Sequence, residues 1–132
     1  MNSYDTEYYP EFNGLKSRNP SLKTAISIGG WDAGGAVFSK LVADSGSRQT
    51  FISSVVSFMK QYGFDGVDID WEYPVASDRG GAPGDKENFV TFLQELKAAC
   101  GSTYFVSITI PSSYWYMTVS YTHLTLPTIL RV

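Results

Sequence analysis

The sequence has 132 residues, a length that suits a single domain with one hydrophobic core. Hydrophobic residues make up 43% and charged residues 17%, which is the composition of a globular chain and not of a disordered one. The formal net charge is −3, and no apolar run approaches the roughly 20 residues that span a bilayer. These values exclude nucleic acids and membranes as the main partners.

The N-terminal quarter of the chain contains a helix pattern and then a strand pattern. Tyr8, Phe12 and Leu15 recur at helical spacing, which predicts an amphipathic helix over residues 7–17. The segment 22–28 (LKTAISI) is short and partly β-branched, and a Gly-Gly pair follows it, so it predicts a strand.

A longer helix is predicted over residues 47–62. Ser45 or Ser47 can cap its N-terminus, and Gly63 ends it. The apolar stripe of this helix consists of Phe51, Val55 and Met59, with Ile52 and Val56 beside it.

The second half of the chain repeats the alternation. Residues 64–69 predict a strand, and residues 75–84, which are rich in Gly and Pro, predict a loop. Asp85 can cap the following helix, which ends before Gly101. Residues 104–110 (YFVSITI) predict a third strand. The buried stripe of the helix between these strands is predicted to be Phe89, Leu93, Leu96 and Cys100.

This alternation of strands and helices predicts an α/β fold with a parallel sheet. Two architectures fit: a small doubly wound sheet, or a slice of a (β/α)8 barrel. A complete barrel needs about 250 residues, and three strands cannot close one. The second option therefore implies a partial TIM barrel with about three β/α units.

The most informative stretch is the second strand and the residues after it. Side chains two residues apart share one face of a strand, so Asp68, Asp70 and Glu72 point one way and Val67 and Ile69 the other. Three acids on one face repel each other. A solvent-facing acidic edge would explain them, but helices on either side of the strand in sequence favour a sheet covered on both faces.

Metal binding and proton transfer remain as roles for these acids. A calcium loop of the EF-hand type needs a Gly within the loop and a later Glu at a set spacing, and neither is present. Neighbouring carboxylates do not all ionise easily, so one is kept protonated near neutral pH. Glu72 follows the strand at the barrel end where catalysis occurs, which makes it the candidate acid, with Asp70 sharing a proton. Asp65 breaks the alternation, and we expect a structural role for it.

Two motifs give these residues a family resemblance. The run from Asp65 to Glu72 (DGVDIDWE) resembles the DxxDxDxE signature of family 18 glycoside hydrolases, and residues 27–31 (SIGGW) resemble the SxGG motif of the preceding barrel strand. The motifs occur in the family's order with one helix between them. The flanking residues 31–35 and 75–81 are most similar to large fungal chitinases, some of which are related to killer-toxin α-subunits.

The resemblance implies a substrate-assisted mechanism on chitin or N-acetylglucosamine oligosaccharides, with no cofactor and no metal. Glu72 would protonate the glycosidic oxygen, and the acetamido oxygen of the substrate would attack the anomeric carbon to give an oxazolinium ion. Asp70 would orient the acetamido group and stabilise this positive charge. Asp68 would take up a proton or tune Asp70.

The remaining site residues are expected to bind substrate or to shape the site. Ser27 belongs to the SxGG motif, and Gly29 and Gly30 either let the backbone approach the open barrel end or form an ordinary turn. Tyr73 is placed to touch substrate. Trp31 and Trp115 are candidates for stacking on sugar rings, although the core is the favoured location for Trp31, as it is for most large aromatics. Trp71 alternates away from the acids and should pack against the outer helices.

The resemblance covers about residues 7–117 and predicts a partial catalytic domain over 1–117. The family's Met-Tyr-Asp motif and late Trp have no counterpart here, and Met1 is expected not to be the true start. Residues 118–132 resemble a translated sequencing adapter, so His123 carries no functional expectation. We expect the 132-residue chain alone to be unstable or inactive, because unpaired sheet edges favour aggregation.

Three other functions fit the same residues. An endo-β-N-acetylglucosaminidase acting on N-glycans would share the acids, and loops outside this sequence would distinguish it. A chitin-binding lectin keeps the groove but loses the acid, and the presence of Glu72 argues against it. A toxin subunit would be recognised only by flanking domains. The substrate class implies an extracellular location.

Overall fold

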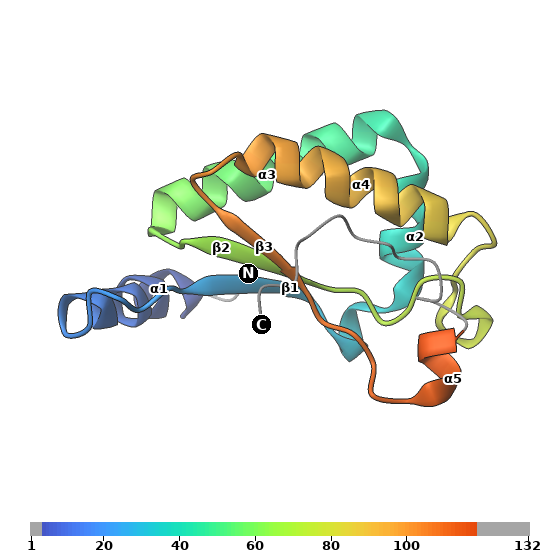
Figure 1. Cartoon of the computed structure of the whole chain (residues 1–132), viewed down its shortest axis with the longest axis horizontal. Coiled ribbons are helices and arrows are strands. Elements are labelled where there is room, and N and C mark those ends of the chain that lie inside the picture. The colour runs from blue at the N-terminus through green and yellow to red at the C-terminus, as the bar shows by residue number, and fades with distance from the viewer. Residues whose placement is uncertain (1–3, 119–132) are drawn as a thin grey trace.

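The computed structural model describes residues 4–118, in which strands and helices alternate (Figure 1). The strands are β1 (Ala25–Gly29), β2 (Gly66–Asp70) and β3 (Phe105–Ile108). The α-helices are α1 (Asp5–Gly14), α2 (Gly35–Ala43), α3 (Ser45–Tyr62), α4 (Asp85–Cys100) and α5 (Tyr114–Tyr116). Single 3-10 turns are η1 (Leu15–Ser17), η2 (Trp31–Ala33) and η3 (Ser77–Arg79). The helices described between residues 4 and 118 include none that is both long and apolar enough to cross a membrane.

The three strands form one parallel sheet in the order β1-β2-β3. Figure 1 shows α3 and α4 lying across the same face of this sheet. A doubly wound sheet reverses its strand order and carries helices on both faces, whereas a barrel keeps sequential order and places its helices outside. The described strands and helices therefore form a slice of a (β/α)8 barrel, which is the second of the two predicted architectures.

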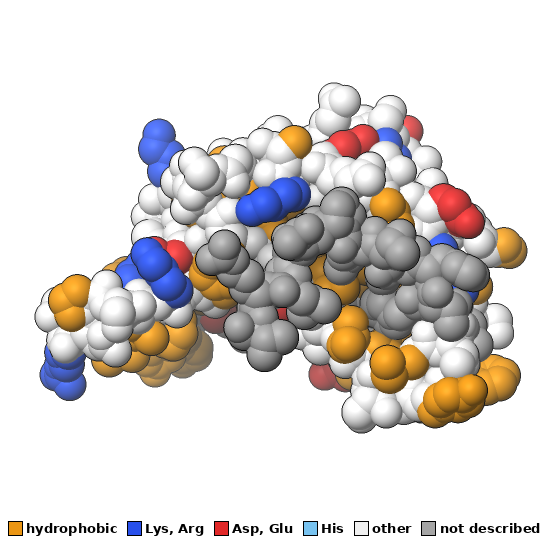
Figure 2. All heavy atoms as spheres, in the orientation of Figure 1, with side chains coloured by type: hydrophobic (Ala, Val, Ile, Leu, Met, Phe, Trp, Pro, Cys, Tyr) orange, Lys and Arg blue, Asp and Glu red, His pale blue; other side chains and the backbone are white. Residues whose placement is uncertain are grey.

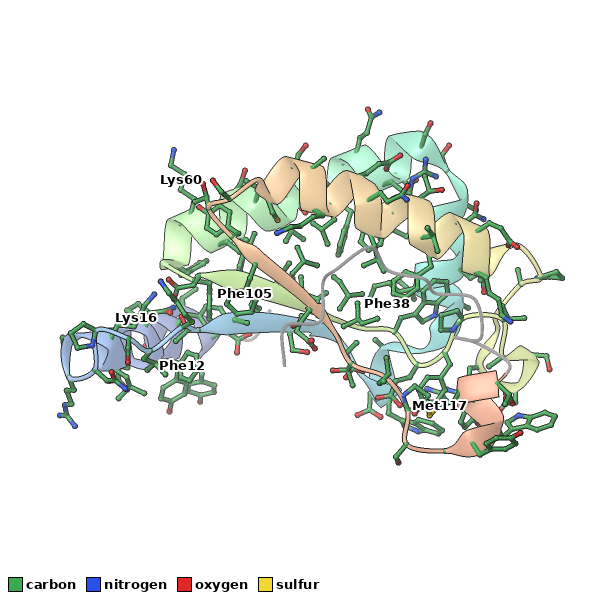
Figure 3. The ribbon with its side chains drawn as sticks, in the orientation of Figure 1. Phe12, Lys16, Phe38, Lys60, Phe105 and Met117 are labelled. Atoms are coloured by element: carbon green, nitrogen blue, oxygen red, sulfur yellow. The ribbon has the colours of Figure 1, made fainter. Side chains whose placement is uncertain are left out.

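The hydrophobic core lies between the outer face of the sheet and helices α2, α3 and α4. On the sheet, Val67, Ile69 and Val106 are almost completely buried. Figure 3 shows Phe38 of α2 on the helix side of the sheet, where it belongs to the same cluster. The predicted stripe of α4 is confirmed, since Phe89, Leu93, Leu96 and Cys100 are all buried.

The N-terminal helix forms as predicted, but its residues are at most half-buried, and a different face from the predicted one meets the core. Tyr8, Phe12 and Leu15 are exposed, so the prediction that they form the apolar stripe was wrong. Tyr9 provides the contacts instead, with its ring 5.4 Å from Phe58 and similarly close to two neighbouring aromatic rings. Phe12, labelled in Figure 3, keeps its ring 6.3 Å from that of Phe64 but stays exposed, and Figure 2 shows hydrophobic side chains on the surface of this protruding helix.

Both predicted N-terminal caps were wrong by one position or more, whereas Gly63 and Gly101 follow the last residues of their helices as predicted. The side chain of Asp44, and not Ser45 or Ser47, caps α3 by accepting a hydrogen bond from Ser47 N at 2.7 Å. Gly84 occupies the cap position of α4, and Asp85 is the first helical residue. Helix α2 was not predicted, because one glycine precedes it, another begins it, and its buried face is short.

The strand boundaries differ slightly from those predicted, and some predictions concern residues that the structure does not describe. The first and second strands begin two or three residues later than predicted, and the third ends two residues earlier. Residues 1–3 and 119–132, which contain Met1 and His123, lie outside the described part of the chain.

Asp65 lies at the beginning of β2, at the opposite end from Glu72. Its carboxylate accepts hydrogen bonds from Lys16 Nζ at 2.8 Å and from Thr24 N at 3.0 Å, and Lys23 Nζ lies at 3.3 Å. These contacts join η1, the residues leading into β1, and β2. Burial by itself raises the pKa of Asp65, but the hydrogen bonds from Lys16, Thr24 and Lys23 outweigh burial and hold the pKa far below its ordinary range. The arrangement supports the structural role expected for this residue.

Replacing Asp65 by Asn should lower the free energy of unfolding by about 1–3 kcal/mol at pH 7, because charge-assisted hydrogen bonds are lost. A carboxyl with a depressed folded pKa stabilises above its unfolded value of about 4, and this contribution disappears as pH falls toward the folded value. Urea unfolding of the wild type and of Asp65→Asn should therefore give free energies of unfolding that converge as the pH is lowered from 7 to 2. A gap that is equally large at both ends of this range would contradict the assignment.

Candidate active site

The inner face of the sheet is polar, and Asp68 lies at its centre. Strand pairing places Ser27, Asp68 and Ser107 level across the three strands. The carboxylate of Asp68 accepts hydrogen bonds from Ser27 Oγ at 3.0 Å, Ser107 Oγ at 2.7 Å and Thr109 Oγ1 at 2.8 Å. Three hydroxyl donors therefore fix the orientation of this carboxylate in the floor of the site.

Asp70 is the last residue of β2, one step closer to the open end of the strands. Its Oδ1 atom is buried and has no hydrogen-bond partner among the residues that the structure describes. Burial raises the pKa of Asp70, and the charges of Glu72 and Asp68 raise it further. The two neighbouring acids thus act on Asp70, which also offers one acceptor oxygen without a partner among the described residues.

Two glycines of the SxGG motif allow β1 to lie against Asp70. A Cβ atom on Gly29 would come within 2.0 Å of the Asp70 carbonyl oxygen, and Gly30 N donates a hydrogen bond to the same oxygen at 2.8 Å. Both glycines have positive φ angles, 128° and 90°, which favour residues without a Cβ. The geometry at Gly29 supports the close-approach interpretation, whereas a Cβ atom on Gly30 would lie 3.7 Å from Asp70 Oδ2, an ordinary contact distance.

Glu72 lies two residues beyond the end of β2 and is half-buried. Burial raises the pKa of the Tyr73 hydroxyl, and a hydrogen bond with Glu72 adds to this shift. The ring of Tyr73 lies 4.2 Å from that of Tyr116, whose hydroxyl donates to Asp78 at 2.7 Å. Tyr73 is thus fixed beside the acid.

The two tryptophans near the acids have opposite surroundings. Trp71 is fully buried, stacks on Phe38 at 5.7 Å and meets the edge of Phe89 at 5.1 Å, which confirms that it packs against the outer helices. Trp31 is 54% exposed, so the preference for a core location was wrong. Its position just past the end of β1 places it at the rim, where the helices do not cover it. Trp115 is exposed as well.

Arg79 connects the two loops at this rim and was missed in the sequence. Its guanidinium lies 3.6 Å from the centroid of the Trp31 ring, and it donates hydrogen bonds to the carbonyl oxygens of Glu72 and Trp31. No pattern in a Gly-rich loop indicates such a contact. Ser107 and Thr109 were also missed, but their alternation with Val106 and Ile108 would have placed them on the acidic face.

The arrangement combines a carboxyl group at the open rim with a half-buried carboxyl, one oxygen of which is buried and has no hydrogen-bond partner among the described residues. Such a pair can protonate a leaving group and accept a hydrogen bond from, or stabilise a positive charge on, a bound substrate. Within residues 4–118 no group of three His, Cys, Asp or Glu side chains is arranged to hold a metal ion.

Comparisons with known proteins agree with this geometry. The family described as glycosyl hydrolases family 18 matches residues 1–130. An endochitinase of Manduca sexta is 47% identical over 95 residues, which cover 72% of this chain and 17% of that protein. Chitotriosidase-1 of Mus musculus is 45% identical over 95 residues, covering 72% and 20% of the two chains.

A solved structure shows the same arrangement of elements. The Ostrinia furnacalis Group IV chitinase in complex with allosamidin superposes with a TM-score of 0.82 at 32% identity, over 88% of this chain and 31% of that one. The chain thus spans about a fifth of the length of the curated relatives named above and about a third of this structure. The fungal subtype is not tested by these comparisons and stays a prediction.

Proposed function

The chain belongs to glycosyl hydrolases family 18, and from that premise we propose that it carries the acid of an enzyme that hydrolyses β-1,4 bonds between N-acetylglucosamine units of chitin. The observation that supports this most directly is the buried Oδ1 of Asp70, which is influenced by the charge of Glu72 and has no hydrogen-bond partner within residues 4–118. An acceptor without a partner in the described residues suits a substrate amide. The names of the relatives, an endochitinase and a chitotriosidase, point to the same substrate class.

In the proposed reaction Glu72 protonates the glycosidic oxygen, and the acetamido oxygen of the substrate attacks the anomeric carbon. Asp70 accepts a hydrogen bond from the acetamido N–H through its Oδ1 atom, and its negative charge stabilises the oxazolinium ion. Water then opens the ring of this intermediate, with Glu72 now acting as base. Asp68, whose carboxylate is oriented by three hydroxyl donors, takes up a proton or tunes Asp70 through its charge.

Other residues would bind substrate or hold the site in shape. Trp31 presents an exposed ring, backed by Arg79, on which a sugar can stack. Tyr73 can reach a bound sugar from beside Glu72. Gly29 acts through its close approach to Asp70, and Gly30 through the hydrogen bond that its N–H donates to the Asp70 carbonyl oxygen. Chitin lies outside cells or in their walls, so the proposed location is extracellular.

Substrate assistance gives the proposal a specific test in the full-length protein. The N-acetylglucosamine tetramer should be cleaved at least about 10³-fold more efficiently than cellotetraose, because cellotetraose lacks the acetamido group that serves as intramolecular nucleophile. Chromatography of the products measures both rates, and proton NMR identifies the first anomer released.

The stereochemistry provides a second criterion on the same samples. Attack by the acetamido oxygen and then by water inverts the anomeric carbon twice, so the β-anomer should appear first. Comparable cleavage of cellotetraose, or initial release of the α-anomer, would refute the proposed mechanism.

A further inference from the structure

Asp85 is a buried carboxylate that belongs to none of the proposed catalytic steps. It is only 1% exposed, although it is the first residue of α4. Its Oδ1 accepts a hydrogen bond from Ser39 Oγ at 2.7 Å. Its Oδ2 accepts from Val75 N at 3.0 Å and from Ala82 N at 2.7 Å. One side chain therefore joins α2, α4 and both ends of the loop between Val75 and Ala82.

This loop continues directly from the proposed acid, and we call residues 72–82 the acid loop. Val75, three residues after Glu72, has a φ angle of 64°, which a β-branched residue rarely adopts. Backbone strain of this kind persists only where the surroundings fix it, and it is concentrated at functional sites. The N–H of Val75 is bound by Asp85, so Asp85 fixes the strained residue itself.

The acid loop also packs closely, both within itself and against α2. A Cβ atom on Gly81 would lie 2.7 Å from backbone atoms of Val75, and one on Gly35 at the start of α2 would lie 2.5 Å from the Arg79 carbonyl oxygen. Helix α4 is anchored in the core by Phe89 and other buried residues. A shift of the loop relative to α4 would thus have to break the hydrogen bonds to Asp85 or create clashes.

We propose that Asp85 is a positioning residue for Glu72: it fixes the acid loop to α2 and α4, so that the carboxyl of Glu72 stays where it meets the leaving oxygen. The inference rests on the proposed function of Glu72. General acid catalysis needs the donor within hydrogen-bond reach of the leaving atom. A displacement of about 1 Å at such a group costs on the order of 10²-fold in rate.

Substitutions of Asp85 test whether its three hydrogen bonds hold the acid loop in place. In Asp85→Asn the amide oxygen can still accept from Val75 N and Ala82 N, while the amide nitrogen donates to Ser39 Oγ. Asp85→Ala removes all three bonds. Asp85→Ser keeps one acceptor and replaces the Ala variant if that variant does not fold. Leu96→Ala is the matched control, because Leu96 is buried in the same helix about three turns away and belongs to the core and not to the acid loop.

Two readouts are measured in the full-length protein: amide hydrogen exchange of the acid loop, and kcat and KM on the N-acetylglucosamine tetramer. Asp85→Ala should speed exchange at Val75 and Ala82 at least about tenfold and lower kcat about 10²-fold, with KM changed less than about threefold. Asp85→Asn should restore both readouts to within about threefold of wild type. Leu96→Ala should lower Tm and leave loop exchange and kcat unchanged.

The inference is overturned if Asp85→Ala leaves loop exchange or kcat at the wild-type value. It is also overturned if Leu96→Ala lowers kcat as much, since the effect would then follow from lost stability. Failure of the proposed function looks different, because wild type itself would not cleave the tetramer. Hydrogen exchange reports on the link between Asp85 and the loop in either case.

Discussion

Replacing Glu72 by Gln in the full-length protein is expected to lower kcat on the N-acetylglucosamine tetramer by at least about 10³-fold. The amide has nearly the shape of the carboxyl but has no proton of suitable acidity for the leaving oxygen. Sugar binding should persist with a Kd within about threefold of wild type, because the aromatic and Asp70 contacts remain. Initial rates and calorimetric titration with the tetramer measure the two quantities.

Glu87→Gln is the matched control, since Glu87 is an exposed residue of α4 and should tolerate the same substitution without loss. Turnover at the wild-type rate in Glu72→Gln would remove Glu72 from the mechanism. A wild-type protein that binds the tetramer and never cleaves it would instead indicate a lectin. The same titrations therefore distinguish an enzyme with a different acid from a protein without catalytic activity.

The parts of the site that lie on strands were predictable from sequence because a strand turns successive side chains to opposite faces. Asp68 and Asp70 lie on the polar face, and Val67 and Ile69 on the buried one, as that alternation required. Helix α4 was equally accessible, since its stripe recurs with helical period over more than three turns. In both cases the local backbone period decides the outcome.

The features that could not be predicted depend on contacts between distant segments. Arg79 reaches back to Trp31 across 48 positions, and Asp85 reaches Ser39 across 46. The apolar stripe of α1 was misassigned for a related reason: period identifies a helix, but the position of its partner decides which face is buried. Trp31 was predicted to lie in the core because most large aromatic side chains do, whereas its location at the rim keeps it exposed.

Asp70→Asn should slow the reaction and stabilise the fold at the same time. The neutral amide cannot offer a charge to the oxazolinium ion, so kcat should fall about 10²-fold. Burial, followed by the charges of Glu72 and Asp68, raises the folded pKa of Asp70. A carboxyl whose folded pKa is raised destabilises the fold when it is ionised, so the Asn variant should gain about 1 kcal/mol at pH 7.

The sign of the pH dependence separates this effect from ordinary repacking. The stability advantage of Asp70→Asn should shrink as pH falls through the raised folded pKa and vanish below the unfolded value of about 4, where Asp70 is neutral in both states. Asp68→Asn is the matched control and should destabilise at pH 7, because Asp68 is satisfied by three hydroxyl donors. Thermal unfolding of both variants between pH 3 and pH 8 measures this. A loss of stability in Asp70→Asn at pH 7 would show that the charge of Asp70 is already compensated in the folded protein. The ionised Asp70 carboxyl would then not destabilise the fold, and no stability would be lost for its role in catalysis.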